Sequence, residues 1–184
     1  METHGGYGAI WWQCYQDIDD GVVFEKDPAK SATLAMYRPT WAVYECDCEG
    51  ALRAGVGSHL PVSFLDVDPY GEPWPAIDAF FQSERPFPPT LAIVVNDGLR
   101  QKLKMNGGWN VGSLEHVVAR YGNNVLYANY LEICKEMLQE KASQRGYTLT
   151  RWRGYHCGHI GSGKTSMTDG QMTHYAGLFN RDAG

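Results

Sequence analysis

The chain has 184 residues, and 43% of them are hydrophobic, which is enough for the core of one domain. We therefore expect a single domain over residues 1–184. A net charge of −5 excludes a generally basic nucleic-acid-binding surface, so a polyanionic partner would need a local basic patch. Five irregularly spaced cysteines, without a signal peptide or a long apolar span, predict free thiols, a cytoplasmic setting and no membrane segment.

A glycine-rich loop at residues 2–8 opens the chain, and an apolar stretch of helical character follows it. Glycines let backbone amides approach a ligand closely, and a helix N-terminus behind them favours negative charge. The pattern is not the dinucleotide fingerprint, because Trp11 stands where that fingerprint needs a small residue. By itself the loop identifies no ligand.

Two apolar segments that end in acidic residues come next. Residues 21–27 are predicted as a buried strand with Glu25 near its end, and Pro28 can then open a helix that continues over residues 29–36. Residues 41–45 are predicted as another strand, followed by Asp47 and a short helical turn at residues 50–53. Glu25 lies about 20 residues beyond the glycine loop, the offset at which an acid meets the hydroxyl pair of a ribose.

The segment at residues 62–81 carries the strongest functional signal. An apolar run containing Asp66 ends at Asp68, because a strand does not continue through Pro69. Prolines at positions 73 and 75 are expected to delay the next helix until residue 76. A carboxylate beside a backbone carbonyl accepts two hydrogen bonds, which suits the exocyclic amine of a nucleobase, and Tyr70 offers a face for stacking. The alternative is a solvated acidic turn.

The second half of the chain continues the alternation of strands and helices. Strands are predicted at residues 91–96, 147–152 and 172–180, and helices at residues 114–121 and 126–146. This order predicts a three-layer α/β sandwich with a mostly parallel, Rossmann-like sheet and an antiparallel last strand. Six basic residues that follow the late strands form either a phosphate-binding edge or a solvated surface: Arg100, Lys102, Lys104, Arg151, Arg153 and Lys164.

Taken in order, these elements resemble a class I S-adenosylmethionine-dependent methyltransferase. Within that superfamily, residues 66–79 read DVDPYGEPWPAIDA and are similar to the D-x-D-P-[FY]-G-x-P-x-P-x-x-D-A segment of tRNA guanine-N2 dimethyltransferases. The resemblance covers most of the chain and implies S-adenosylmethionine as the cofactor. In that family a full strand precedes the glycine loop, whereas only Met1 precedes Glu2 here, so we expect a truncated first strand.

The cofactor-binding residues that the resemblance implies lie in the glycine loop or at strand ends: Glu2, Gly5, Gly6, Gly8, Glu25, Asp47, Cys48 and Asp66. Glu2 and the glycine loop would hold the methionine part, Glu25 the ribose hydroxyls, and Asp47 with Cys48 the adenine edge. The catalytic residues that it implies are Asp68 and the Pro69 carbonyl, which would hold the target amine, and Tyr70, which would stack on the base.

Substrate contacts are expected from Trp74, Arg100 and Lys102, with a nucleic acid as the substrate, and packing of Trp74 in the core or in a lid is an alternative of at least equal weight. No metal is needed. Residues 158–165 match the phosphate-loop pattern, but a poor helix start follows them, so we interpret the match as coincidence. Cys46-x-Cys48 and His156-Cys157-x-His159 are interpreted as ordinary thiols and loop histidines rather than a zinc site. Two alternatives to the nucleic-acid methyltransferase stay open: a cofactor-binding module or partner subunit without catalysis, and a methyltransferase for a protein or small-molecule amine.

Overall fold

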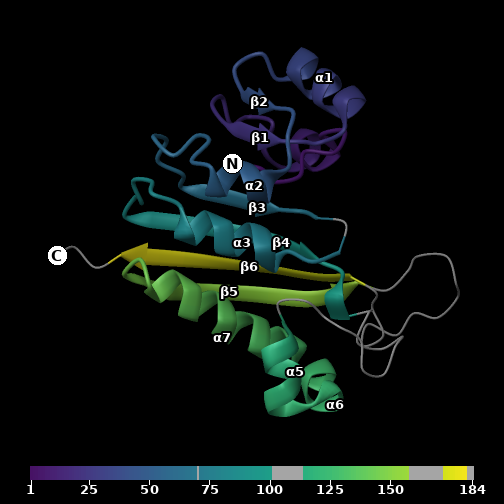
Figure 1. Ribbon diagram of the computed structural model, residues 1–184, viewed down its shortest axis with the longest axis vertical. Helices are drawn as coiled ribbons and strands as arrows, with labels where there is room; N and C mark the ends of the chain where they lie inside the picture. Colours follow the sequence, from purple (N-terminus) through teal and green to yellow (C-terminus); the bar gives the residue numbers. More distant parts are fainter. Residues whose placement is uncertain (70, 101–113, 158–171, 182–184) are drawn as a thin grey trace, which may run out of the picture.

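The structure, a computed structural model, describes residues 1–69, 71–100, 114–157 and 172–181 (Figure 1). Its elements in chain order are the π-helical turn η1 (Trp11–Tyr15), β1 (Val22–Phe24), α1 (Pro28–Tyr37), β2 (Ala42–Tyr44), α2 (Cys48–Arg53), β3 (Phe64–Val67), α3 (Trp74–Gln82), β4 (Thr90–Asp97), α5 (Glu115–Tyr121), α6 (Asn123–Ala128), α7 (Tyr130–Ser143), β5 (Tyr147–Cys157) and β6 (Met172–Arg181). The alternation of strands and helices predicted from the sequence is confirmed.

The strands lie side by side in the order β2-β1 and β3-β4-β6-β5 (Figure 1). The pairs β1–β2 and β3–β4 are parallel, whereas β6 runs antiparallel to both β4 and β5. Glu2 joins the two groups, since it forms parallel bridges to Val23 of β1 and to Asp66 of β3. The predicted sheet, mostly parallel with an antiparallel last strand, is therefore confirmed.

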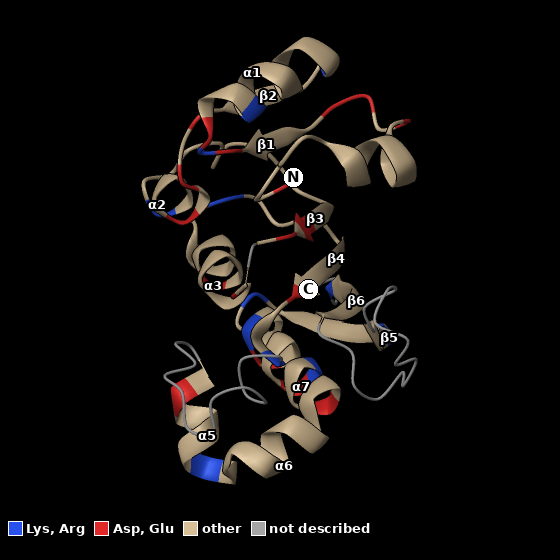
Figure 2. Cartoon of the chain, turned by 90° about the vertical axis from the view of Figure 1, so that its right-hand side faces the viewer, with Lys and Arg blue, Asp and Glu red and all other residues tan. Residues whose placement is uncertain are grey.

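Side chains that alternate along β1 reach two separate parts of the core, so at this strand helical segments pack on both faces of the sheet. Val22 and Phe24 pack in the large cluster that α2, α3 and α7 help to form. Val23, between them, packs instead against Leu34 of α1 and Trp11 of η1. Figure 2 shows α2, α3 and α7 together on one side of the strands.

Several element boundaries differ from the prediction by a few residues, and three of the differences have a local reason. Helix α3 begins at Trp74, earlier than expected, because Pro75 occupies the first turn, where its missing N–H costs nothing. The long helix predicted at residues 126–146 is two helices, since the chain breaks at Asn129, whose side chain donates to the Val125 carbonyl (3.1 Å). Strand β5 extends to Cys157 because its pairing with β6 continues to that residue.

Candidate functional site

The acids predicted at strand ends gather at one edge of the sheet. Glu25, Asp47 and Asp68 follow β1, β2 and β3, which are parallel, so their carboxyl ends share an edge. His4, in the glycine loop, lies among them. Burial lowers the pKa of its imidazole, and the carboxylates of Asp68, Glu25 and Asp47 oppose that change. The three acids lie at the strand ends where the sequence predicted them, their roles toward a cofactor or substrate stay predictions, and His4 was not singled out from the sequence.

The glycine loop is built for close approach between backbone and side chains. Gly6 and Gly8 have positive φ angles of 53° and 78°, which L side chains adopt at a cost. A Cβ atom on Gly5 would lie 2.5 Å from side-chain atoms of both Leu34 and Val23. The Gly6 N–H donates to a carboxylate oxygen of Glu25 (2.8 Å), so the loop is fixed against the end of β1.

Glu25 keeps acceptor capacity on both of its oxygens. One oxygen accepts from the Gly6 N–H (2.8 Å) and the other from the Asp27 N–H (2.9 Å). Each carboxylate oxygen has two lone-pair sites, so each retains one. A carboxylate held in place by backbone donors can thus accept a pair of neighbouring hydroxyl groups, the chemistry that a ribose offers.

The residues after β2 differ from each other in exposure. Asp47 is exposed and accepts the Gly50 N–H (2.9 Å) as the N-cap of α2. Cys48 is buried, and its sulfur lies 3.6 Å from Nε2 of His4. Burial raises the pKa of the Cys48 thiol to about 12, so it is neutral at physiological pH and inert as a nucleophile.

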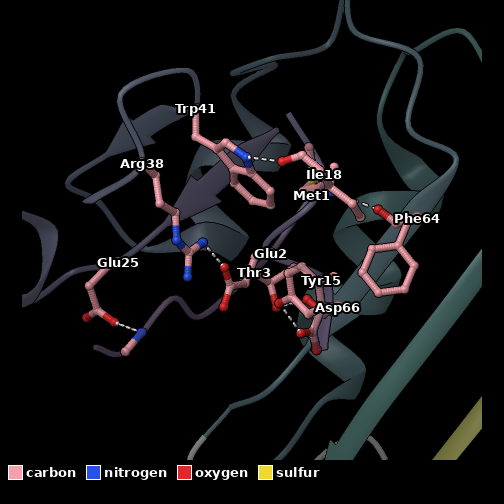
Figure 3. A network of polar contacts seen from close by, with 11 residues as sticks. Met1, Glu2, Thr3, Tyr15, Ile18, Glu25, Arg38, Trp41, Phe64 and Asp66 are labelled. Carbon is pink, nitrogen blue, oxygen red and sulfur yellow. Dashed lines mark hydrogen bonds and ion pairs between the residues drawn. The ribbon is translucent and has the colours of Figure 1, made fainter. Parts of the chain in front are cut away.

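Glu2 and Asp66 belong to a buried polar network beside this edge (Figure 3). Glu2 is paired with Arg38, and the Arg38 guanidinium lies over the rings of Trp11 and Trp41, with centroids at 4.6 and 4.9 Å. Burial raises the pKa of Glu2 to about 7, although the hydrogen bond from Arg38 lowers it.

Asp66, the second acid of the network, accepts the Tyr15 hydroxyl (2.5 Å). Burial raises the pKa of its carboxyl, and the hydrogen bond from Tyr15 opposes this. Both acids therefore have partners within the protein, and their contact with a cofactor stays a prediction.

The segment after β3 presents Asp68 and is tied down on both sides. Among the described residues, no hydrogen bond or ion pair engages the partly exposed Asp68 carboxylate. The Pro69 carbonyl accepts the Gly71 N–H (2.8 Å), which leaves it one lone pair. The Gly71 carbonyl accepts the Gly98 N–H (2.9 Å), so the loops after β3 and β4 are joined. Tyr70 lies outside the described residues.

Asp97, at the end of β4, is a buried carboxyl that the sequence analysis did not single out. It has no exposed surface and accepts the hydroxyls of Tyr130 (2.9 Å) and Tyr175 (3.1 Å) and the Leu99 N–H (2.8 Å). Burial raises its pKa to about 6. The available signal was its position, since Asp97 ends an apolar strand as Asp68 does.

The predicted substrate residues are more buried than expected. Trp74 is fully buried and stacks on Tyr175 at 6.5 Å between ring centroids, so it packs in the core rather than facing a substrate. Arg100 is 5% exposed, and its guanidinium lies 4.0 Å from the centroid of the Tyr127 ring. Lys102 and the phosphate-loop match at residues 158–165 lie outside the described residues.

The described part of the chain contains neither a cluster of metal-ligating side chains nor a membrane-spanning helix. No group of His, Cys, Asp or Glu side chains there could hold a metal ion. No helix there is long and apolar enough to cross a membrane.

No family model matches the chain, and no curated protein matches it. Solved structures share its fold at low sequence identity. Trm1 from Pyrococcus horikoshii, in complex with S-adenosyl-L-methionine, superposes with a TM-score of 0.64 at 10% identity, over 98% of this chain and 49% of that chain. TYW2 from M. jannaschii, in complex with AdoMet, superposes with a TM-score of 0.52 at 12% identity, over 98% of this chain and 68% of that chain. The plantazolicin methyltransferase BamL, in complex with a triazolic desmethylPZN analog and SAH, superposes with a TM-score of 0.56 at 9% identity, over 98% of this chain and 76% of that chain. The fold is therefore that of class I methyltransferases.

Proposed function

We propose that the protein is a class I S-adenosylmethionine-dependent methyltransferase that methylates an exocyclic amine of a nucleobase in RNA or DNA. The observation that carries the proposal is the convergence of Glu25, Asp47 and Asp68 on one edge of the sheet, around His4. The shared fold supports it, since similar structures were solved with S-adenosylmethionine or its demethylated product.

The residues at this edge fit the cofactor that the proposal requires. Glu25, with one free lone pair on each oxygen, suits the two ribose hydroxyls, and the exposed Asp47 suits the adenine edge. The Gly8 N–H donates to the Gly5 carbonyl (2.9 Å), and the Gly6 N–H donates to Glu25. These glycines would therefore contribute by letting the cofactor approach the backbone closely rather than by donating hydrogen bonds to it. The bound cofactor supplies an activated methyl group.

Asp68 and Pro69 would hold the nucleophile. A carboxylate oxygen and a carbonyl oxygen side by side accept the two N–H bonds of an amine, which turns the nitrogen lone pair away from them. The nitrogen gains positive charge when it is methylated, and the Asp68 carboxylate stabilises that charge and accepts the released proton. Alignment and charge stabilisation are the contributions of the protein.

Calorimetric titration with S-adenosylmethionine, and with ATP as the negative control, tests the cofactor assignment. We expect micromolar affinity for S-adenosylmethionine and no binding of ATP. We expect Glu25→Gln to weaken cofactor binding about tenfold or more. Glu49→Gln is the matched control, because Glu49 follows β2 nearby but pairs with Arg53. Equal weakening in both variants, or none in Glu25→Gln, would contradict the ribose assignment.

A methyltransferase for a protein or small-molecule amine is the second candidate. The net charge of −5 favours it, because an acidic surface repels a polyanion. Transfer of radiolabelled methyl groups to RNA, to DNA and to amine compounds separates the two candidates. Transfer to amines but not to nucleic acid would favour the second.

A further inference from the structure

One face of the sheet formed by β4, β6 and β5 is open in the described part of the chain. Helices α2, α3 and α7 lie on the opposite side (Figure 2). On the open side, partly exposed apolar residues of β4 and β6 and two arginines of β5 line a shallow hollow of about 230 Å³. This surface is distinct from the cofactor-binding edge but continuous with it.

The strand register arranges the open face in three rows, each running from β4 across β6 to β5: Asn96–His174–Tyr155, Val94–Ala176–Arg153 and Ala92–Leu178–Arg151. Alternate residues of a strand project to the same side, so Arg151, Arg153 and Tyr155 form one column along β5. Successive members are about 7 Å apart along the strand. We call these three residues, with His174, the Arg–Tyr stripe.

The Arg–Tyr stripe begins at the edge of the sheet where Asp68 lies. Val67 pairs with Val95, so Asp68 comes level with Asn96, in the same row as His174 and Tyr155. The carboxylate of Asp68 also acts electrostatically on His174: it opposes the lowering of the pKa that burial causes there. The rings of His174 and Tyr155 are stacked, with centroids 5.2 Å apart. A continuous row therefore links the predicted catalytic acid to an exposed aromatic face.

Charge and exposure of the stripe fit a polyanion with flat, apolar groups. Arg151 and Arg153 are exposed, and neither has an ion-pair partner among the described residues. Tyr155 is 57% exposed although its ring is large and apolar. On β6, Ala176 and Leu178 are apolar, and none of the residues in the three rows is acidic. In a chain of net charge −5, this is the local basic patch that nucleic-acid binding would require.

We propose that the Arg–Tyr stripe binds the nucleotides next to the target base as a single strand. Phosphates lie at Arg151 and Arg153, and a base stacks on Tyr155, so the strand runs up the open face and delivers the target base to Asp68. Sheet surfaces with exposed aromatic and basic side chains bind single strands in this way. The proposal rests on the proposed function and adds to it where and in which form the substrate binds.

Fluorescence anisotropy with a labelled single-stranded RNA of about 12 nucleotides tests the proposal. We expect the double variant Arg151→Ala with Arg153→Ala to weaken binding about tenfold or more and to reduce the salt slope of log K by about 1.4. Tyr155→Ala should weaken binding roughly five- to hundredfold without changing that slope. Tyr155→Phe, which keeps the aromatic ring, should bind as tightly as the wild type. The charge-matched control is Arg53→Ala with Lys135→Ala, because both residues are exposed on helices of the opposite side.

The outcomes separate this inference from the proposed function. Methyl transfer to RNA by the wild type, with an equal KM in the arginine double variant and its control, would overturn the inference and leave the function standing. A wild type that binds the cofactor but neither binds nor methylates RNA or DNA would overturn the nucleic-acid function and the inference with it. A wild-type dimer that the arginine substitutions dissociate would make the face a contact between copies and would also overturn the inference.

Discussion

Replacing Asp97 by asparagine should change how the stability of the protein depends on pH. Asp97 is fully buried, and burial raises the pKa of its carboxyl from 3.8 to about 6 in the folded state. Asparagine has nearly the same shape and carries no charge. Its oxygen can accept the Leu99 N–H, and its amide can donate to Tyr130 and Tyr175 because their hydroxyls can rotate to accept.

The sign of this pH dependence follows from which state, folded or unfolded, holds the Asp97 proton. Below about pH 3 the carboxyl is protonated in both the folded and the unfolded state. Between 3.8 and about 6 only the folded state retains the proton, so the free energy of unfolding falls as the pH rises through this window. At about 1.4 kcal/mol per pH unit, the wild type loses about 3 kcal/mol that the variant keeps.

Urea unfolding from about pH 3 to about pH 7 measures this loss. The difference in the free energy of unfolding, Asp97→Asn minus wild type, should rise by about 3 kcal/mol across the range. Glu2 and Asp66, whose pKa values burial also raises, are present in both proteins and cancel. Asp20→Asn, which removes an exposed carboxylate, controls for the loss of one negative charge. A difference that stays constant or falls with pH would refute the reasoning.

Two further predictions concern the acid at the end of β3 and the glycine loop. Asp68→Asn should lower methyl transfer about a hundredfold or more while cofactor affinity changes less than about threefold, as measured by single-turnover transfer and calorimetry; lost cofactor binding would contradict its role at the amine. Gly5→Ala should destabilise the fold by about 1–3 kcal/mol in urea unfolding, because its Cβ would overlap Leu34 and Val23. Gly6→Ala is the comparison, since no atom lies within 4 Å of that Cβ and only the φ of 53° opposes it, at a cost of about 1 kcal/mol; a larger loss in Gly6→Ala would show that sterics at Gly5 do not dominate.

The proposed function and the stripe together explain how an acidic chain could act on a polyanion. The carboxylates that would bind the cofactor and the amine under the proposed function concentrate negative charge at one edge, around His4. Arg151 and Arg153 place positive charge on a different surface, the open face, where it is not neutralised by those acids. A substrate held at the stripe would need to bring only its target base to Asp68.

Much of the fold followed from the sequence because its strands are short, mainly apolar runs that end at acids or turn residues. The run before Asp68 and the run before Asp97 were recognisable for that reason. Helices between them required a parallel sheet, and a parallel sheet puts successive strand ends at one edge. The meeting of Glu25, Asp47 and Asp68 therefore needed no coordinates, only the order of elements along the chain.

What packs against a side chain, in contrast, was decided only by the tertiary structure. Trp74 was expected near a substrate, but it lies in the core against Tyr175, which comes from a strand a hundred residues away along the chain. Glu2 pairs with Arg38 because α1 brings that guanidinium to the buried centre of the sheet. Arg151 and Arg153 lie within a strand and not after one, because β5 continues as long as β6 supplies hydrogen bonds. Periodicity states which residues share a face, whereas only the packed elements determine whether that face is covered, paired or open.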